Sequence, residues 1–206
     1  MNIVTENLGK RFNREWIFKK LSYTFEQGNY YAITGPNGSG KSTLMQVLWG
    51  QVPQSQGQLS YSSSAMDAIP IDECHQHLSI ATPYMELIEE FTLEEMVTFH
   101  FKFKGVLNDE SADQIISRMA LDHARKKQVA NFSSGMKQRL KLGLAFFSKT
   151  TALFLDEPTS NLDKKAIEWY QVNLREVARE RLVLIASNVD YEYPEESKKL
   201  DLLDFK

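Results

Sequence analysis

The stretch that decides the fold is Gly35-Pro36-Asn37-Gly38-Ser39-Gly40-Lys41-Ser42-Thr43. It matches the pattern G-x-x-x-x-G-K-[ST] at every fixed position, between a short apolar run at residues 30–34 and a helical pattern at residues 42–49. Glycines let the backbone curl so that successive amides point at an anion, and the start of a helix adds partial positive charge there. We therefore expect this loop to bind a nucleoside triphosphate, with Lys41 on the β- and γ-phosphates and Ser42 on Mg²⁺. A plain glycine-rich turn is the alternative, but four fixed positions match by chance in only about one chain in a hundred of this length.

Two carboxylates follow a second apolar run, in Leu153-Phe154-Leu155-Asp156-Glu157. In a protein with a phosphate loop, the acid at such a strand end holds Mg²⁺, which predicts that role for Asp156. Neighbouring strand residues alternate between faces, so Glu157 can face the attacking water as a general base. More than a hundred residues separate Lys41 from Asp156, which leaves room for further strands and a helical insertion.

Composition excludes several classes of protein. The chain has 206 residues with 24 basic and 27 acidic side chains, a net charge of −3, which argues against nucleic-acid binding through bulk positive charge. The single cysteine, Cys74, cannot form an internal disulfide and suits a reducing compartment. The longest apolar runs, residues 142–147 and 182–186, fall far short of the roughly 18 residues of a membrane span. We expect a soluble cytoplasmic protein without a secretory signal.

Periodicity outside the two motifs indicates an α/β protein. Residues 4–25 predict antiparallel strands around a turn near Asn13, and residues 57–61 predict another strand. Residues 85–147 are mainly helical, with capping-box spacing at Thr92 and Glu95. Asp163 can cap a helix that runs through Arg179, and residues 182–186 form a further buried strand. Strands alternating with helices at both ends predict an α/β core with a helical insertion.

Three further stretches carry a resemblance to a known family. They are Ser160-Asn161-Leu162-Asp163 after the acidic strand end, the segment Phe132-Ser133-Ser134-Gly135-Met136-Lys137-Gln138-Arg139, and the aromatic residue Phe12. With the two motifs above, they make nearly the whole chain similar to the nucleotide-binding subunit of an ATP-binding cassette (ABC) protein. The resemblance implies a P-loop NTPase core with a mainly parallel sheet, an N-terminal antiparallel β subdomain and a helical insertion at about residues 84–147. We expect one nucleotide-binding domain over residues 1–206.

The segment of residues 132–139, here the signature segment, resembles the family motif written LSGGQ. Ser133 can cap a helix whose first amides form an anion site, although an ordinary capped helix would have the same pattern. The resemblance implies that Ser133, Ser134 and Gly135 meet the ATP held by a second subunit, in a homodimer or a pair with a similar chain. It also implies that Phe12 stacks on adenine and that the cofactors are ATP and Mg²⁺.

The chain departs from the family at three places, of which the smallest change is Ser134 in place of the second signature glycine. Pro83 or Tyr84 stands where the family has a glutamine that touches Mg²⁺ and water, and Asn188 stands where it has a histidine that contacts the γ-phosphate. Asparagine can donate a hydrogen bond but cannot become cationic. Because Lys41, Asp156 and Glu157 remain, we expect ATP hydrolysis that is slow or dependent on a partner, with Asn188 in the catalytic set.

The leading functional interpretation is the ATPase subunit of a membrane transporter, similar to small haem- and multidrug-exporter subunits. The membrane part would be a separate polypeptide that docks on the helical insertion, especially on residues 84–104, and holds this chain at the inner face of the cell membrane. Two alternatives stay open: a soluble cassette protein that remodels a macromolecular complex, and a subunit that clamps ATP with weak hydrolysis. No nucleic-acid partner is expected.

Other patterns favour ordinary structural explanations. Residues 74–77 (Cys-His-Gln-His) lack a second ligand cluster at zinc spacing and predict a solvated loop. Aromatic and basic residues alternate at residues 99–104, which predicts a helix end or a docking surface more than a nucleic-acid site. Residues 195–199 predict a solvated loop.

Overall fold

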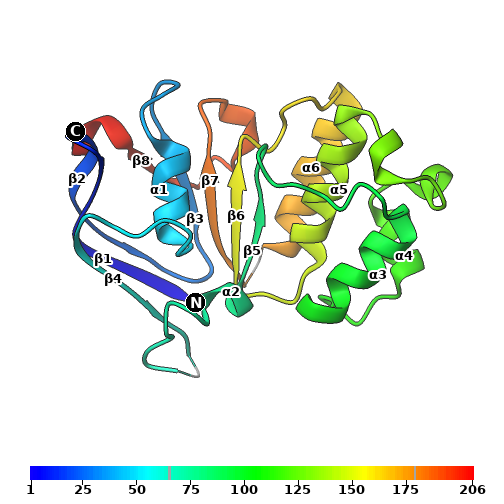
Figure 1. The fold of residues 1–206 in the computed structure, drawn as a ribbon, viewed down its shortest axis with the longest axis horizontal. Coiled ribbons are helices and arrows are strands. Elements are labelled where there is room, and N and C mark those ends of the chain that lie inside the picture. The colour runs from blue at the N-terminus through cyan, green and yellow to red at the C-terminus, as the bar shows by residue number, and fades with distance from the viewer. Residues whose placement is uncertain (65, 179) are drawn as a thin grey trace.

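Two β-sheets organise the chain in the computed structural model, which describes residues 1–64, 66–178 and 180–206 (Figure 1). The larger sheet is parallel throughout. Its strands are, in spatial order, β5 (Leu78–Ala81), β6 (Ala152–Asp156), β7 (Leu182–Ala186), β3 (Tyr30–Thr34) and β8 (Lys198–Asp201). Since β7 separates β6 from β3, whatever follows β7 lies between the loop after β3 and the acids that end β6.

The smaller sheet is antiparallel and has the order β2-β1-β4. Its strands are β1 (Asn2–Phe12), β2 (Glu15–Phe25) and β4 (Gln56–Ser62). The turn between β1 and β2 lies at Asn13, whose φ of 52° is a left-handed conformation that asparagine tolerates. The predicted N-terminal antiparallel strands are therefore confirmed.

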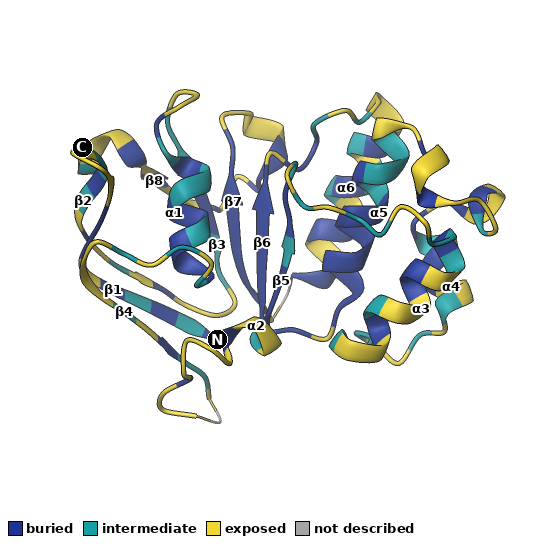
Figure 2. Cartoon of the chain, in the orientation of Figure 1, coloured by how far each residue is buried: buried dark blue, intermediate teal, exposed yellow. Residues whose placement is uncertain are grey.

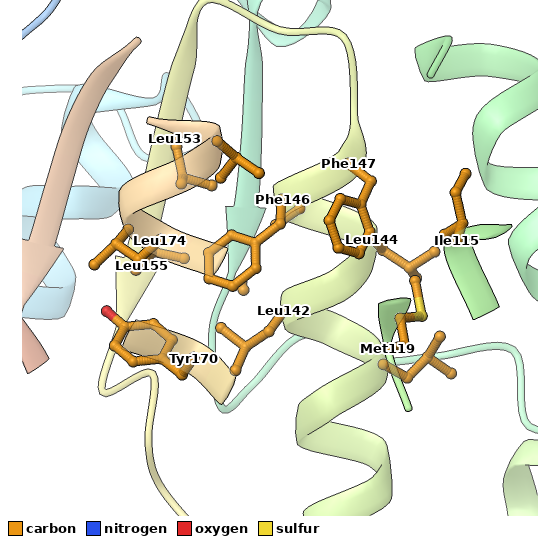
Figure 3. Close-up of a cluster of buried hydrophobic side chains, with 14 of the residues drawn as sticks. Ile115, Met119, Leu142, Leu144, Phe146, Phe147, Leu153, Leu155, Tyr170 and Leu174 are labelled. Atoms are coloured by element: carbon orange, nitrogen blue, oxygen red, sulfur yellow. The ribbon is translucent and has the colours of Figure 1, made fainter. Parts of the chain in front are cut away.

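The parallel sheet is covered on both faces, which explains why β6 and β7 are apolar along their whole length. Successive residues of each strand enter different cores. Leu153 and Leu155 pack with the helices α5 (Ser134–Phe147) and α6 (Lys164–Val177), whereas Phe154 packs with α1 (Lys41–Leu48) and the antiparallel sheet. Figure 2 shows these central strands as buried from end to end, and Figure 3 shows Leu153 and Leu155 beside Tyr170 and Phe146.

Helices divide between the two faces of the parallel sheet (Figure 1). On one face lies α1 (Lys41–Leu48), between the two sheets. The other face carries α5 (Ser134–Phe147) and α6 (Lys164–Val177), with α3 (Leu93–Lys104) and α4 (Ala112–Arg118) beyond them. The short helices are α2 (Cys74–His77) and the 3₁₀ turns η1 (Asp122–Ala124), η2 (Val129–Asn131), η3 (Asp190–Glu192) and η4 (Leu202–Phe205). No helix in the described part of the chain is long and apolar enough to cross a membrane.

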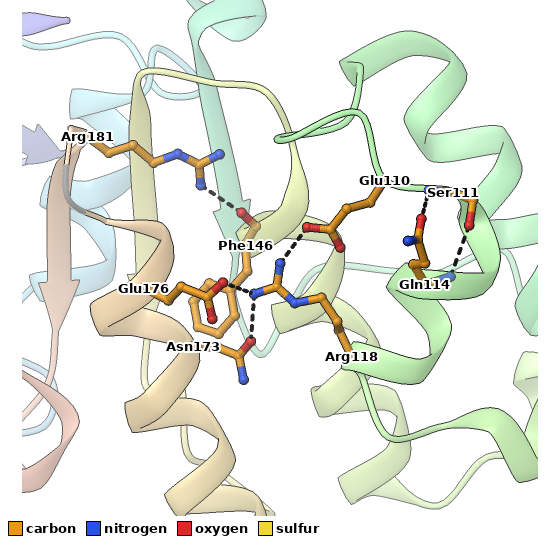
Figure 4. A network of polar contacts seen from close by, with 8 residues as sticks. All are labelled: Glu110, Ser111, Gln114, Arg118, Phe146, Asn173, Glu176 and Arg181. Atoms are coloured by element: carbon orange, nitrogen blue, oxygen red, sulfur yellow. Dashed lines mark hydrogen bonds and ion pairs between the residues drawn. The ribbon is translucent and has the colours of Figure 1, made fainter.

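Cationic side chains tie the helices together on the second face (Figure 4). Arg118 of α4 pairs with Glu110 at 2.6 Å and with Glu176 of α6 at 2.8 Å. Arg181 is buried and donates to the carbonyl of Phe146 at 2.9 Å and to that of Ser148, so it satisfies carbonyls that the end of α5 leaves free. Burial lowers the pKa of Arg181 to about 10.

Three expectations need correction. The helix that begins after Asp163 ends at Val177, and Arg179, its expected end, lies outside the described residues. Residues 195–199 are not all loop, because Lys198 and Lys199 begin β8, which hydrogen-bonds to β3. A short edge strand with exposed lysines has almost no apolar periodicity, which hides it in the sequence. Residues 74–77 are likewise not a loop but the one-turn helix α2, whose Cys74 is buried in the core that contains α1 and Phe154.

Candidate nucleotide-binding site

The loop of residues 35–43, here the phosphate loop, joins β3 to α1, as predicted. Lys41 is buried at the first position of α1, and its Nζ donates to the carbonyl oxygens of Gly35 at 2.7 Å and Pro36 at 3.3 Å. The ammonium group therefore lies across the loop. A lysine held inside a ring of backbone is a point charge well placed to bind phosphate oxygens.

Gly40 sets the start of α1. Its φ of 101° is a conformation that side chains avoid, and a Cβ added there would lie 2.2 Å from Ile17 Cγ2 of β2. Gly40 is also the N-cap of α1 and supplies no side-chain hydrogen bond to the helix. The first amides of α1 are thus not capped by a side chain, which leaves them available to an anion.

Asp156 ends β6 and is only 2% exposed. Its Oδ1 has no hydrogen-bond partner among the described residues. Burial raises the pKa of Asp156, while the hydroxyl of Ser42 and the charge of Lys41 act in the opposite direction. A buried carboxylate oxygen without a partner, beside a hydroxyl, supplies the hard oxygen donors that Mg²⁺ prefers. Ser42 and Asp156 therefore fit the predicted magnesium ligands.

Glu157 leaves the sheet in a different direction from Asp156. Its φ of 43° is left-handed, its amide donates to the Ala186 carbonyl at 3.0 Å, and its side chain is exposed. The two neighbouring carboxylates thus have different surroundings, one buried and one open to water. This is the separation that the assignment of Asp156 to the metal and Glu157 to water requires; the roles themselves stay predictions.

Asn188 follows β7 and contacts the phosphate loop directly. Its Oδ1 accepts a hydrogen bond from the Gly35 amide at 3.2 Å, and its Nδ2 donates to Asn37 Oδ1 at 3.2 Å. The strand order explains this meeting, since β7 lies beside β3. The structure therefore places Asn188 at the phosphate loop, where the sequence predicted a catalytic contact.

The signature segment lies at a second, separate place. Ser133 caps α5 by accepting the Met136 amide at 3.3 Å, and Ser133 and Ser134 are exposed. A Cβ on Gly135 would lie 3.0 Å from the Asn161 carbonyl oxygen, so the loop of residues 160–163 runs close to this helix start. The residues around the start of α5 border a cavity of about 410 Å³, and no phosphate-loop residue lines it.

Three other residues named from the sequence, Phe12, Pro83 and Tyr84, make no hydrogen bond to the phosphate loop in the described structure. The Phe12 ring is half-exposed at the end of β1, with Lys10 Nζ 4.8 Å from its centroid, and its adenine-stacking role stays a prediction. Pro83 and Tyr84 follow β5, and Tyr84 is 79% exposed. Tyr84, Asp156 and Trp49 line a cavity of about 530 Å³.

Two buried side chains near the site, Glu192 and Lys141, were not predicted from the sequence. The Glu192 carboxylate accepts hydrogen bonds from the Thr159 amide at 2.9 Å and from the Thr159 hydroxyl, and so holds the turn just after Glu157. Lys141 of α5 donates to the carbonyls of Thr82 and Pro83. Glu192 lies in a polar segment, so no sequence pattern predicts its burial. Lys141 lies between two leucines, a pattern from which its burial could have been predicted.

Comparison with known sequences agrees with this geometry. Residues 18–160 match the family described as ABC transporter. An uncharacterized ABC transporter ATP-binding protein of Bacillus subtilis, YybJ, is 30% identical over 88% of this chain and 83% of its own length. The lipoprotein-releasing system ATP-binding protein LolD of Idiomarina loihiensis is 30% identical over 91% of this chain and 86% of its own length.

Comparison with solved structures shows the same fold. An ABC transporter ATP-binding protein from Pyrococcus furiosus superposes with a TM-score of 0.82 at 18% identity, covering 100% of this chain and 99% of that one. A bacterial Atm1-family ABC exporter with ATP bound gives a TM-score of 0.80 at 20% identity, covering 97% of this chain and 36% of the exporter. The predicted α/β class with parallel and antiparallel sheets is confirmed.

Proposed function

The chain belongs to the ABC transporter family as an ATP-binding subunit, and on that premise we propose that it hydrolyses ATP at the phosphate loop to power a separate membrane subunit. ABC ATPases generally bind ATP with Mg²⁺, hydrolyse it, pair as dimers and work with transmembrane subunits. The convergence of Lys41, Ser42, Asp156 and Asn188 at the start of α1 supports the proposal most directly. The chain acts as one nucleotide-binding domain over residues 1–206.

Each side chain at the site has a role in this proposal. Lys41 and the uncapped amides of α1 bind the phosphates, and Ser42 and Asp156 hold Mg²⁺, which neutralises phosphate charge when bound. Glu157, exposed to water, accepts a proton as water attacks the terminal phosphorus and ADP leaves. Asn188 donates a hydrogen bond from Nδ2, which here goes to Asn37.

The role of Glu157 is tested by steady-state ATP hydrolysis of the wild type and of Glu157→Gln. Loss of the general base lowers kcat about 100-fold or more, while ATP affinity stays within about threefold because the phosphate loop is intact. Glu195→Gln is the matched control, since Glu195 is exposed and borders a separate cavity with Gln171 and Arg175 of α6. Equal rates in wild type and Glu157→Gln contradict the role.

The substitutions at Pro83, Tyr84 and Asn188 support slow or partner-dependent turnover. A neutral asparagine stabilises developing phosphate charge less than a cationic histidine does. Asn188→His therefore raises kcat of the purified chain, read in the same assay. No change would mean that this position does not limit turnover. The same substitutions favour, as a second candidate, a subunit that clamps ATP with weak hydrolysis.

The exposed signature segment supports a head-to-tail pair of subunits, either two copies of this chain or this chain with a similar one. In such a pair Ser133, Ser134 and Gly135 of one subunit complete the phosphate site of the other. The exposure of Ser133 and Ser134 and the adjoining cavity of about 410 Å³ leave room for that contact.

Aromatic side chains on the helical insertion support docking of a membrane subunit there. Phe103 is 72% exposed, and its ring meets Phe99 at 5.1 Å, which meets Phe91 at 5.5 Å. These three rings form an apolar surface on and near α3, of the kind that marks an interaction site, and Tyr84 is a further exposed aromatic residue of the insertion. Docking there would hold the chain at the cytoplasmic face of a membrane.

Co-purification tests this surface. Recovery with a polytopic membrane protein, lost in Phe103→Glu, supports the transporter; the control Val172→Glu changes an apolar residue of α6 that is 65% exposed. Recovery only in soluble complexes contradicts membrane docking and favours a cassette protein that remodels a macromolecular complex.

A further inference from the structure

Residues 82–85, here called the wall, lie beside two cavities, and Met85 lines both of them. On one side Thr82, Tyr84 and Met85 line the cavity of about 530 Å³ that Asp156 also lines. On the other side Met85 lines a cavity of about 440 Å³ together with Lys141 of α5. The position of this wall therefore contributes to the space beside Asp156.

Very little holds the wall in place. The Met85 amide donates to the Thr82 carbonyl at 3.2 Å, a contact within the turn itself. Lys141 Nζ donates to the Pro83 carbonyl at 2.7 Å and to the Thr82 carbonyl at 3.3 Å. From Pro83 to Ile88, no other side chain of the described residues makes a hydrogen bond to the backbone. Lys141 is thus the polar link between this segment and the rest of the molecule.

The surroundings of Lys141 are unusual for a lysine. The side chain is 9% exposed, it lies between the buried Leu140 and Leu142, and it pairs with no carboxylate within 4.0 Å among the described residues. Burial, and then the charge of Lys137, lower its pKa. A buried cation without an anion is costly, and an apolar side chain such as methionine would fill most of the same space at a lower cost in free energy. The two carbonyl contacts account for a lysine at this position.

We propose that Lys141 is a positioning residue that fixes residues 82–85 against α5 and thereby holds the wall of the cavity beside Asp156. Because α5 begins at the signature segment, the contact also joins that segment's helix to the polypeptide beside the magnesium ligand. The expected effect of Lys141 on turnover rests on the proposed ATP hydrolysis. The positioning of residues 82–85 by Lys141 does not depend on that function.

Lys104 of α3 offers a matched control at the other end of β5. Its Nζ donates to the carbonyls of His75 and Leu78, the latter at 3.1 Å, so it too is a partly buried amine on two backbone oxygens. Replacing either lysine by methionine keeps the apolar stem and removes the donor. Only the Lys141 contact lies on the wall.

Amide hydrogen exchange of the full chain without nucleotide tests the positioning of residues 82–85. Lys141→Met raises the exchange rate of residues 84–88 about tenfold or more, and Lys141→Arg, which restores a donor, stays within about threefold of the wild type. Lys104→Met instead raises exchange around residues 75–78 and leaves residues 84–88 within about threefold. Unchanged exchange at residues 84–88 in Lys141→Met overturns the proposal, and so does an equal rise across α3, α5 and β6, which reports general destabilisation.

Kinetics test the link to turnover. Lys141→Met lowers kcat about three- to tenfold with KM within about twofold, because the phosphate loop keeps its own contacts, and Lys141→Arg recovers most of the loss. An unchanged kcat, or a loss confined to KM, overturns the link. A wild-type chain that hydrolyses no ATP contradicts the proposed function, while the exchange data still decide what Lys141 does.

Discussion

The starts of α1 and α5 differ although both are helix ends that can bind an anion. At α1 the N-cap is Gly40, which gives the helix no side-chain hydrogen bond, and Lys41 and Asn188 of the same chain surround it. At α5 the N-cap is Ser133, whose side chain already binds the Met136 amide, and its surface is open to solvent. The first site is assembled within one chain. In the proposed pair of subunits, a surface of the other chain completes the second site.

The strand order explains the difference. β3, β7 and β6 are neighbours in one parallel sheet, so the segments that follow them meet at one edge beside α1. α5 lies on the opposite face of that sheet and begins beside the loop that carries Asn161. Side chains can therefore converge on α1 from several strands, whereas at α5 they come from residues 120–123, 133–139 and 161–166, which lie outside the strands.

The largest effect is expected at the first site. Lys41→Met removes the cation that lies across the phosphate loop and weakens MgATP binding about 100-fold or more, since truncating one partner of a close charge pair costs about 2–5 kcal/mol. Titration calorimetry of the single chain measures this affinity. Lys164→Met, at the exposed first position of α6, leaves it unchanged. An unaltered affinity in Lys41→Met would remove the α1 site from the proposal.

The second site should respond only when two chains meet. In Gly135→Val, the new side chain begins 3.0 Å from the Asn161 carbonyl and covers the start of α5. In a Glu157→Gln background, which retains ATP, this change weakens ATP-dependent dimerisation about 30-fold or more while single-chain affinity stays within about twofold. Light scattering with and without MgATP measures the dimer. A loss of single-chain ATP binding would break the distinction between the two helix starts.

Most of the predicted first site is contiguous in the sequence. Residues 35–43 carry the loop, the turn and the lysine in one stretch, and Asp156 follows a run of apolar residues whose period is plain. Asn188 was placed by resemblance, and strand order then explained its contact with Gly35.

Residues outside these motifs could not be placed from the sequence. Lys141 meets Pro83 across 58 positions of chain and Glu192 meets Thr159 across 33, and single-sequence patterns carry no signal for such pairs. β8 was missed because it is short and polar, so its assignment depends on hydrogen bonds to β3. Local sequence patterns predict most helices and strands. Long-range hydrogen bonds such as these become visible only in the folded structure.

A third prediction sharpens the comparison through stability. His100 of α3, on the same face as α5, has its Nε2 2.9 Å from Ser148 Oγ, and burial, then the charge of Lys104, lower its pKa to about 4 from 6.5. As pH falls, His100 is therefore protonated in the unfolded chain before it is protonated in the folded chain. Stability is complete above pH 6.5 and falls as pH drops toward 4, by about 1–2 kcal/mol between pH 7 and pH 5.

Urea unfolding at pH 7, 6 and 5 measures this loss. His100→Gln keeps a hydrogen-bonding group toward Ser148 but does not titrate, so its stability changes less over that range than that of the wild type. Exchange at pH 5 should rise in α3 before it rises in α1. If the free energy of unfolding changes equally with pH in the wild type and in His100→Gln, His100 does not control the pH dependence.

The smallest effect comes from the cap of α6, beside the start of α5. Asp163 accepts the Ala166 amide at 2.8 Å, and Asp163→Ala removes that bond at a cost of about 1 kcal/mol, or about 2–4 °C in Tm for a chain of this size. Asp163→Ser, which keeps a capping oxygen, recovers most of the loss by the same thermal scan. ATP affinity of the single chain stays unchanged in both, because no contact joins Asp163 to the described phosphate loop. α1 has no such side-chain cap, so its first amides stay free for phosphate. A fall in the ATP affinity of the single chain with Asp163→Ala would mean that the starts of α1 and α5 are already coupled within one chain.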